Sequence, residues 1–203
     1  MKIQLYKNDI PTNLKLGESI AIDTEAMGLN HKRDRLCLIQ LSSGNDICHL
    51  IQIEDVKKKT LILLKILKDM KIFKIFHYAR FDVGILNYTY NINVQNIYCT
   101  KIASKLARTF TDKHGYKDIC KELLNKNIVK EKQTSDWGVK KLSLSQQKYA
   151  ATDVLHLHKL QLKLNEILIR ENRINLAQAC FNFLEHRVLL DLSGWHDLDI
   201  FKH

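Results

Sequence analysis

Residues 20–25 of this chain read IAIDTE, an apolar segment that ends in two acidic side chains. Successive side chains of a β-strand point to opposite faces, so Asp23 and Glu25 share one face of the predicted strand. Neighbouring carboxylates repel each other and raise each other's pKa unless a cation lies between them. The pair therefore indicates either a strand that runs into a solvated turn or part of a cation site.

The surrounding sequence predicts strands and helices in the first half and mostly helices in the second. Alternating or continuous apolar runs predict strands over residues 19–24, 35–42, 46–51 and 71–76. Apolar residues at helical spacing predict helices over residues 54–70, 80–90, 115–124, 143–169 and 176–190. Ser143 and Gln146 form a capping box at the start of the fourth helix. This order predicts an α/β fold, with a mixed β-sheet flanked by helices and a helical C-terminal half.

Composition limits the class of protein. The 203 residues are 45% apolar and include seven glycines and one proline, so we expect one domain over residues 1–203. Five scattered cysteines indicate reduced thiols, and we see neither a signal sequence nor a membrane-spanning run. A cytoplasmic location is therefore expected. The net charge of +10 favours nucleic acid over membrane as a partner, although codon bias could give the same excess.

Two further segments place acidic residues in predicted helices. Residues 77–82 read HYARFD, and Asp82 falls in the first turn of a helix, where it could simply complement the helix dipole. Residues 149–153 read YAATD, and a spacing of four places Tyr149 and Asp153 on one helix face. The small residues between them allow close approach to the sheet. A surface Tyr–Asp pair is the alternative.

Taken together, these segments predict a metal site. Four carboxylates converging from separate elements need positive charge between them. Hard oxygen ligands favour two divalent cations, Mg²⁺ or Mn²⁺, which can clamp the attacking and leaving oxygens of a phosphodiester.

The order and spacing of the motifs resemble the tyrosine branch of the DEDD 3′–5′ exonuclease superfamily. Residues 133–138 (QTSDWG) and the following YAATDV resemble ribonuclease D. The short length, HYARFD and the ending GWHDLDIFKH (residues 194–203) resemble the stand-alone nanoRNase C group of that superfamily. The resemblance implies a ribonuclease H-like fold.

The same resemblance implies a role for each catalytic residue. Asp23 would bridge both ions, Glu25 and Asp153 would hold the ion that activates water, and Asp82 would support the other ion. Tyr149 would orient the attacking water. Leu29 would act as a wedge against the terminal base, and core packing is an equal alternative for Met27. The residues expected to bind substrate are Thr24, Met27, Gly28, Leu29, His77, Arg80 and Phe81.

The implied function is a metal-dependent 3′–5′ exoribonuclease that hydrolyses short RNA, down to dinucleotides, to nucleoside 5′-monophosphates. The resemblance also implies a homo-oligomer. Two alternatives remain within the enzyme class: trimming of tRNA 3′ ends, as ribonuclease D does, and general exonuclease action on RNA and DNA. A nucleic-acid-binding module without turnover is disfavoured, because unused acidic residues would repel RNA.

Overall fold

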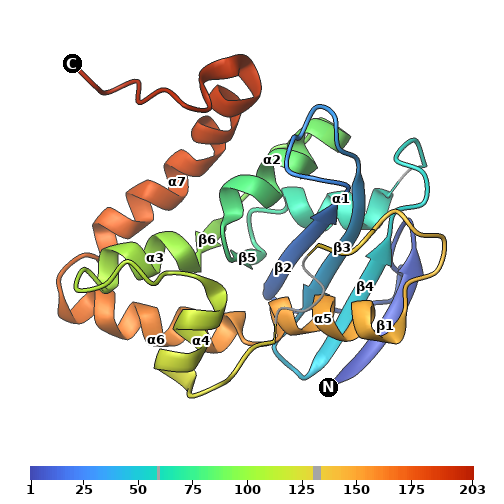
Figure 1. Ribbon diagram of the computed structural model, residues 1–203, viewed down its shortest axis with the longest axis horizontal. Coiled ribbons are helices and arrows are strands. Elements are labelled where there is room, and N and C mark those ends of the chain that lie inside the picture. The colour runs from blue at the N-terminus through green and yellow to red at the C-terminus, as the bar shows by residue number, and fades with distance from the viewer. Residues whose placement is uncertain (59, 130–133) are drawn as a thin grey trace.

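The computed structural model describes residues 1–58, 60–129 and 134–203. Its six strands form one mixed sheet in the order β1-β4-β3-β2-β5-β6 (Figure 1). β2 is antiparallel to β3, which is antiparallel to β4, whereas the pairs β1–β4, β2–β5 and β5–β6 are parallel. The strands are β1 (Lys2–Lys7), β2 (Ser19–Ala26), β3 (Leu36–Ser42), β4 (Ile47–Gln52), β5 (Phe73–Phe76) and β6 (Ile97–Cys99). The mixed sheet with flanking helices confirms the predicted α/β class.

Helices cover the sheet and form most of the second half of the chain. α5 packs along β1 to β4, and Figure 1 shows it crossing one face of the sheet. α3 and α4 pack on α6, and α7 packs on α2, α3 and β6. No helix in the described ranges is long and apolar enough to cross a membrane. The helices are α1 (Leu61–Lys68), α2 (Ala79–Tyr90), α3 (Thr100–Ala107), α4 (Tyr116–Leu124), α5 (Leu144–Leu155), α6 (Leu157–Arg170), α7 (Ile174–Leu190) and a π-helical turn, η1 (Asp191–Trp195).

The central strands carry the core. Every residue of β3 is buried, and Ile20 and Ile22 of β2 are fully buried beside it. Each such aliphatic side chain contributes about 1.5–3 kcal/mol relative to an exposed one. β2 carries Asp23 and Glu25 near its C-terminal end and lies between β3 and β5. Its packed neighbours therefore hold the two acidic residues in place.

Four elements were not expected from the sequence, namely β1, β6, α3 and the π-helical turn η1. The helix predicted over residues 54–70 begins only at Leu61. The Asp9 carboxylate accepts hydrogen bonds from the backbone N–H groups of Ile62 and Leu63, both at 3.0 Å, and so satisfies the helix start from a distant segment. Lys59 of the predicted helix and Gln133 of the QTSDWG motif lie outside the described residues.

The helix predicted over residues 143–169 begins as expected but is divided at His156. Ser143 and Gln146 form the predicted capping box. At the break, the Tyr116 hydroxyl donates to the Thr152 carbonyl at 2.8 Å and accepts from the His156 N–H at 3.3 Å. These two backbone groups would otherwise bond each other in a continuous helix. Insertion of a side chain into the helical ladder is a recognised cause of a kink, and it separates α5 from α6 here.

Replacing Tyr116 with phenylalanine should therefore destabilise the protein. The variant removes the hydroxyl that donates to the Thr152 carbonyl and leaves the His156 N–H with the Val154 carbonyl as its acceptor, so we expect the free energy of unfolding to fall by about 1–2 kcal/mol. Tyr88→Phe is the matched control because its hydroxyl makes only an exposed bond to the Lys32 carbonyl. Urea denaturation of both variants gives the measurement. Equal stability of the two variants would contradict the assigned role.

Candidate active site

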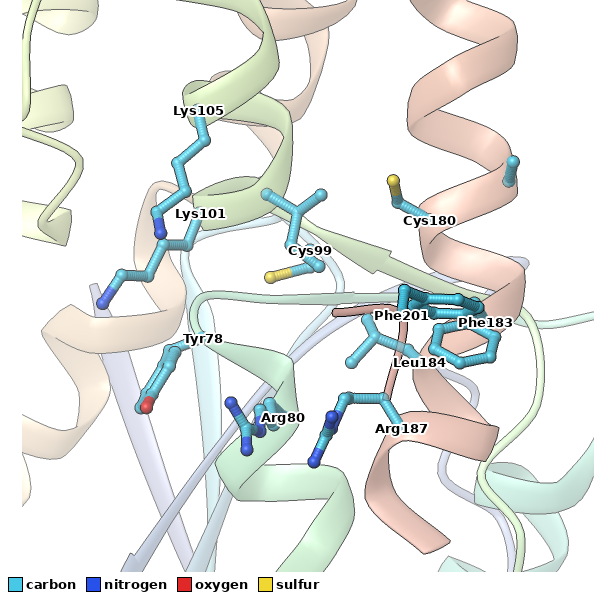
Figure 2. A pocket seen from close by; sticks show the side chains of 12 residues that line it. Tyr78, Arg80, Cys99, Lys101, Lys105, Cys180, Phe183, Leu184, Arg187 and Phe201 are labelled. Carbon is cyan, nitrogen blue, oxygen red and sulfur yellow. The ribbon is translucent and has the colours of Figure 1, made fainter. Parts of the chain in front are cut away.

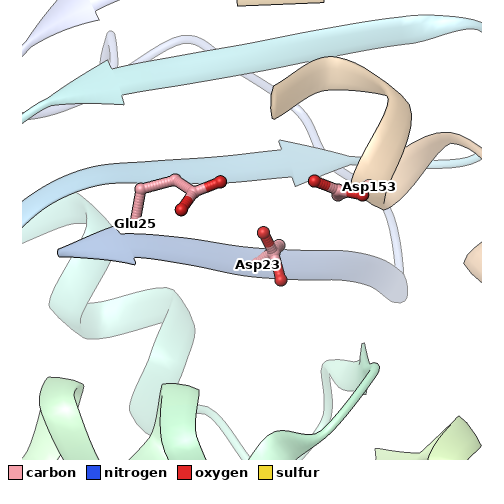
Figure 3. Close-up of side chains that lie close together, drawn as sticks. All are labelled: Asp23, Glu25 and Asp153. Atoms are coloured by element: carbon pink, nitrogen blue, oxygen red, sulfur yellow. The ribbon is translucent and has the colours of Figure 1, made fainter. Parts of the chain in front are cut away.

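Three carboxylates converge above β2. Asp23 and Glu25 project from the same face of the strand, as their spacing predicts, and Asp153 approaches from α5. Figure 3 shows the three side chains directed toward a common space between strand and helix. One carboxylate oxygen from each residue lies within 4.8 Å of the others. A single cation can therefore contact all three residues.

The fourth acidic residue reaches this region from α2. Thr24 points to the opposite face of β2 from Asp23, and its hydroxyl donates to Asp82 Oδ1 at 2.6 Å. Asp82 is only 3% exposed. Burial raises the pKa of Asp82 to about 7, against the lowering effect of the Thr24 bonds. Thr24 thus fixes the orientation of a buried carboxylate at the back of the site.

The environment of Asp23 also disfavours its ionised form. Burial is the largest cause that raises its pKa well above the usual range, and the charges of Asp82, Asp153 and Glu25 add to the effect. A bound cation would reverse the effect of these charges. The donors are carboxylate oxygens, which suit Mg²⁺ or Mn²⁺ better than softer metals. The residues present therefore fit the predicted pair of divalent ions.

Tyr149 lies beside these acids, one helical turn before Asp153. Burial, followed by the charges of Asp153, Glu25 and Asp23, raises the pKa of its hydroxyl well above the ordinary value. The phenol is therefore protonated near neutral pH and can donate a hydrogen bond. Its ring packs on Trp137, with 6.0 Å between the ring centroids.

A cavity of about 730 Å³ opens in front of the acidic residues. Eleven of the site residues predicted from the three motifs and the turn after β2 line this cavity, whereas the twelfth, Arg80, lines a neighbouring cavity. The predicted residues that line the acidic cavity are Asp23, Thr24, Glu25, Met27, Gly28, Leu29, His77, Phe81, Asp82, Tyr149 and Asp153. The sequence motifs thus meet in one place.

The turn after β2 presents an apolar edge to this cavity. Leu29 is 85% exposed, so its side chain is available to a substrate. Met27 lies against Gly138, where a Cβ would approach the Met27 sulfur to 2.5 Å. A Cβ on Gly28 would lie 2.3 Å from an Asp34 carboxylate oxygen. The absence of a side chain at Gly28 thus leaves room for Asp34, and because Gly28 also lines the cavity, its role in substrate binding stays a prediction.

Arg80 occupies a different place from the one its motif suggested. Its guanidinium forms two bonds to the Asp191 carboxylate, at 2.5 and 2.7 Å, and a third to the His196 carbonyl at 2.7 Å. These bonds tie α2 to the segment after α7. The geometry indicates a structural role for Arg80, while His77 remains beside the cavity with Nδ1 2.9 Å from the Thr100 hydroxyl.

Sequence reasoning missed several residues that shape the site. Gln40 lies opposite Asp23 on β3, and its amide donates to Asp23 Oδ2 at 3.3 Å. A polar residue within the apolar strand LCLIQLS was the available signal. His31 packs on Phe81, with ring centroids 4.9 Å apart, and Tyr116 lines the cavity below α5. Nothing local in the sequence marks these two contacts.

Comparison with known proteins places this geometry in a family. The sequence profile of the 3′–5′ exonuclease family matches residues 7–169. The structure of Brucella melitensis NrnC bound to pGG is 49% identical with a TM-score of 0.96, covering 100% of this chain and 99% of that one. NrnC with bound Mg²⁺ is 48% identical with a TM-score of 0.95, and both chains are covered completely.

Ribonuclease D of Gluconacetobacter diazotrophicus is 31% identical over 159 residues. The match covers 77% of this chain but only 39% of the relative, so the chain spans about two fifths of that enzyme. The profile match, this relative and the arrangement of acids on β2, α2 and α5 agree. The chain belongs to the ribonuclease D-like branch of the 3′–5′ exonuclease family.

Proposed function

We propose that this protein is a metal-dependent 3′–5′ exoribonuclease that hydrolyses short RNA, down to dinucleotides, to nucleoside 5′-monophosphates. The observation that carries the proposal is the acidic cavity, in which Asp23, Glu25 and Asp153 bring carboxylate oxygens within 4.8 Å of one another. Such a cluster would repel RNA unless it held cations. Family membership and the NrnC structures with Mg²⁺ and with pGG support this assignment.

Each residue of the cluster has a separate task in this proposal. Asp23, Glu25, Asp82 and Asp153 would hold two divalent cations, Mg²⁺ or Mn²⁺. When bound, such ions supply the positive charge that activates water and stabilises the leaving oxygen. The protonated Tyr149 hydroxyl orients the attacking water by donating or sharing a hydrogen bond. Thr24 keeps Asp82 in position through its 2.6 Å bond.

The turn formed by residues 27–29 would hold the terminal bases. Leu29 supplies exposed apolar surface at the cavity, and Met27, His77 and Phe81 line the adjacent wall. An apolar contact of this kind has room for one or two bases, so short substrates gain most of their affinity here. Longer RNA would add mainly phosphate contacts.

Three broader properties belong to the same proposal. We propose that residues 1–203 act as a single exonuclease domain, because α7 packs on α2 and the Asp191 carboxylate holds Arg80.

A homo-oligomer is proposed from the family resemblance, and a cytoplasmic location is proposed from the composition. The exposed apolar residues Trp195, Leu198 and Ile200 offer a surface for self-association. Light scattering of the purified protein tests the oligomer.

Cleavage should depend completely on a divalent cation, because four acids converge at the site. EDTA should abolish degradation of end-labelled dinucleotide, and excess Mg²⁺ or Mn²⁺ should restore it. Saturating Mg²⁺ should also raise the melting temperature, since binding at 100 times Kd stabilises a protein by about 2.7 kcal/mol. Full activity in excess chelator would exclude the proposed chemistry.

Variants should separate metal binding from orientation of water. Asp23→Ala should lose both cleavage and the thermal shift produced by Mg²⁺, since Asp23 is assigned to both ions. Tyr149→Phe should keep that shift but lower kcat by about 10–1000-fold, as loss of a positioned catalytic hydrogen bond does. Tyr88→Phe provides a surface tyrosine control. A wild-type kcat for Tyr149→Phe would remove this residue from the reaction.

Dinucleotides should be preferred over longer RNA, and the preference should grow with salt. Salt weakens the extra phosphate contacts of longer RNA but not the apolar contact at Leu29. Leu29→Ala should lower kcat/KM for a dinucleotide more than for a longer RNA. Leu162→Ala, an exposed leucine on α6, is the control. If longer RNA is preferred at both low and high salt, trimming of the kind that ribonuclease D performs becomes the better assignment.

A further inference from the structure

A second cavity, of about 520 Å³, lies beside the acidic one. It is enclosed by the start of α2, by α3, by α7 and by the segment after η1 (Figure 2). Its volume falls in the range of small-molecule sites, which is about 300–1000 Å³. Tyr78 and Lys101 line both cavities, so the two are neighbours that share a wall. The proposed cleavage reaction makes no use of the second cavity.

Aromatic and aliphatic side chains form the walls of this cavity. Phe183 of α7 packs on Phe201 of the C-terminal segment, with ring centroids 6.1 Å apart. Tyr78 contributes a third ring from the other side and is 49% exposed. Ile102 and Leu184 complete the apolar floor. These walls suit a flat, weakly polar group such as a nucleobase.

The rim of the cavity is positively charged. Lys101, Lys105, Arg80 and Arg187 line it, and no acidic side chain lines it among the residues that the structure describes. The two arginines share one carboxylate, that of Asp191, and also donate to backbone carbonyls. Their positive charge is therefore only partly neutralised. The two lysines add to a field that favours an anion.

The wall between the cavities is held in an uncommon conformation. Tyr78 has φ 66° and ψ 40°, in the left-handed region that residues with a side chain seldom adopt. The ammonium of Lys101 lies 4.1 Å from the centroid of the Tyr78 ring. Residues kept in such conformations cluster at ligand sites, where the surrounding structure holds them in place. Here the conformation places an aromatic face and a cation together at the shared wall.

We propose that this second cavity binds a nucleoside monophosphate, with its phosphate near Lys101 and Lys105 and its base against Phe183 and Phe201. A ligand that uses the whole cavity must contact both its aromatic walls and its cationic rim. A bare phosphate would contact only the cations, and a nucleoside would contact only the aromatic walls. The ligand class is also that of the reaction product, and this link rests on the proposed function. The cavity would hold a product nucleotide next to the site that releases it.

Calorimetric titration of adenosine 5′-monophosphate into the whole protein in EDTA tests the proposal. EDTA removes cations that would hold a phosphate in the acidic cavity, and the Lys105 and Phe183 side chains line only the second cavity, so their variants report on binding there. We expect Lys105→Ala to weaken binding by up to about five-fold, as loss of one exposed charge contact does. Phe183→Ala should weaken it by about 5- to 100-fold, as loss of base stacking does. Lys121→Ala, an exposed lysine on α4, should bind as the wild type does.

Two smaller probes test the two halves separately. Ribose 5-phosphate and adenosine should each bind more weakly than the mononucleotide. Absence of saturable binding to the wild type, or equal weakening by Lys121→Ala and Lys105→Ala, would overturn the proposal. So would an absence of binding together with a change of oligomeric state in Phe183→Ala, because that result assigns the cavity to contact with a second copy of the chain.

Cleavage of a dinucleotide in Mg²⁺ is measured on the same preparations. Cleavage without nucleotide binding in EDTA overturns the second site and leaves the proposed function intact. Nucleotide binding without cleavage supports the site and overturns the proposed function. The two hypotheses therefore fail in different experiments.

Discussion

Repulsion between closely spaced carboxylates is the constraint that the rest of this structure must overcome. Asp23 and Glu25 are fixed together by the geometry of one strand, and α5 and α2 bring Asp153 and Asp82 to them. Burial and mutual charge raise the pKa of Asp23, which shows that this arrangement is costly for the ionised groups. The packing of β2 between β3 and β5 keeps the acids together. A catalytic metal site is thus built at the expense of local stability.

Local periodicity was sufficient to predict the part of the site that lies within single elements. A spacing of two put Asp23 and Glu25 on one face, and a spacing of four put Tyr149 beside Asp153. The contribution of Gln40 could not be predicted because it depends on the register between β2 and β3. The role of Arg80 depends on Asp191, more than one hundred residues later. Such contacts are properties of the tertiary structure.

The difference between local patterns and contacts made by distant residues also explains which elements of the fold were predicted wrongly. Strongly periodic segments gave α2, α4 and α7 close to their observed bounds. β6 has three residues, too few for a pattern, and β1 is an edge strand whose burial is incomplete. The break at His156 comes from a tyrosine in α4, and the late start of α1 comes from Asp9. In each case a side chain distant in sequence competes with the local helical preference.

The contact between Tyr116 and the break at His156 joins segments that are distant in the sequence, which bears on the order in which contacts form during folding. Asp23 and Asp153 are separated by most of the chain, and the break at His156 lets α5 and α6 run in different directions. Contacts between such distant segments form slowly because loop closure costs entropy before it is repaid. Newly synthesised or partly folded chains therefore lack the assembled acidic cluster. The acidic cluster is therefore complete only once β2 and α5 have docked on each other.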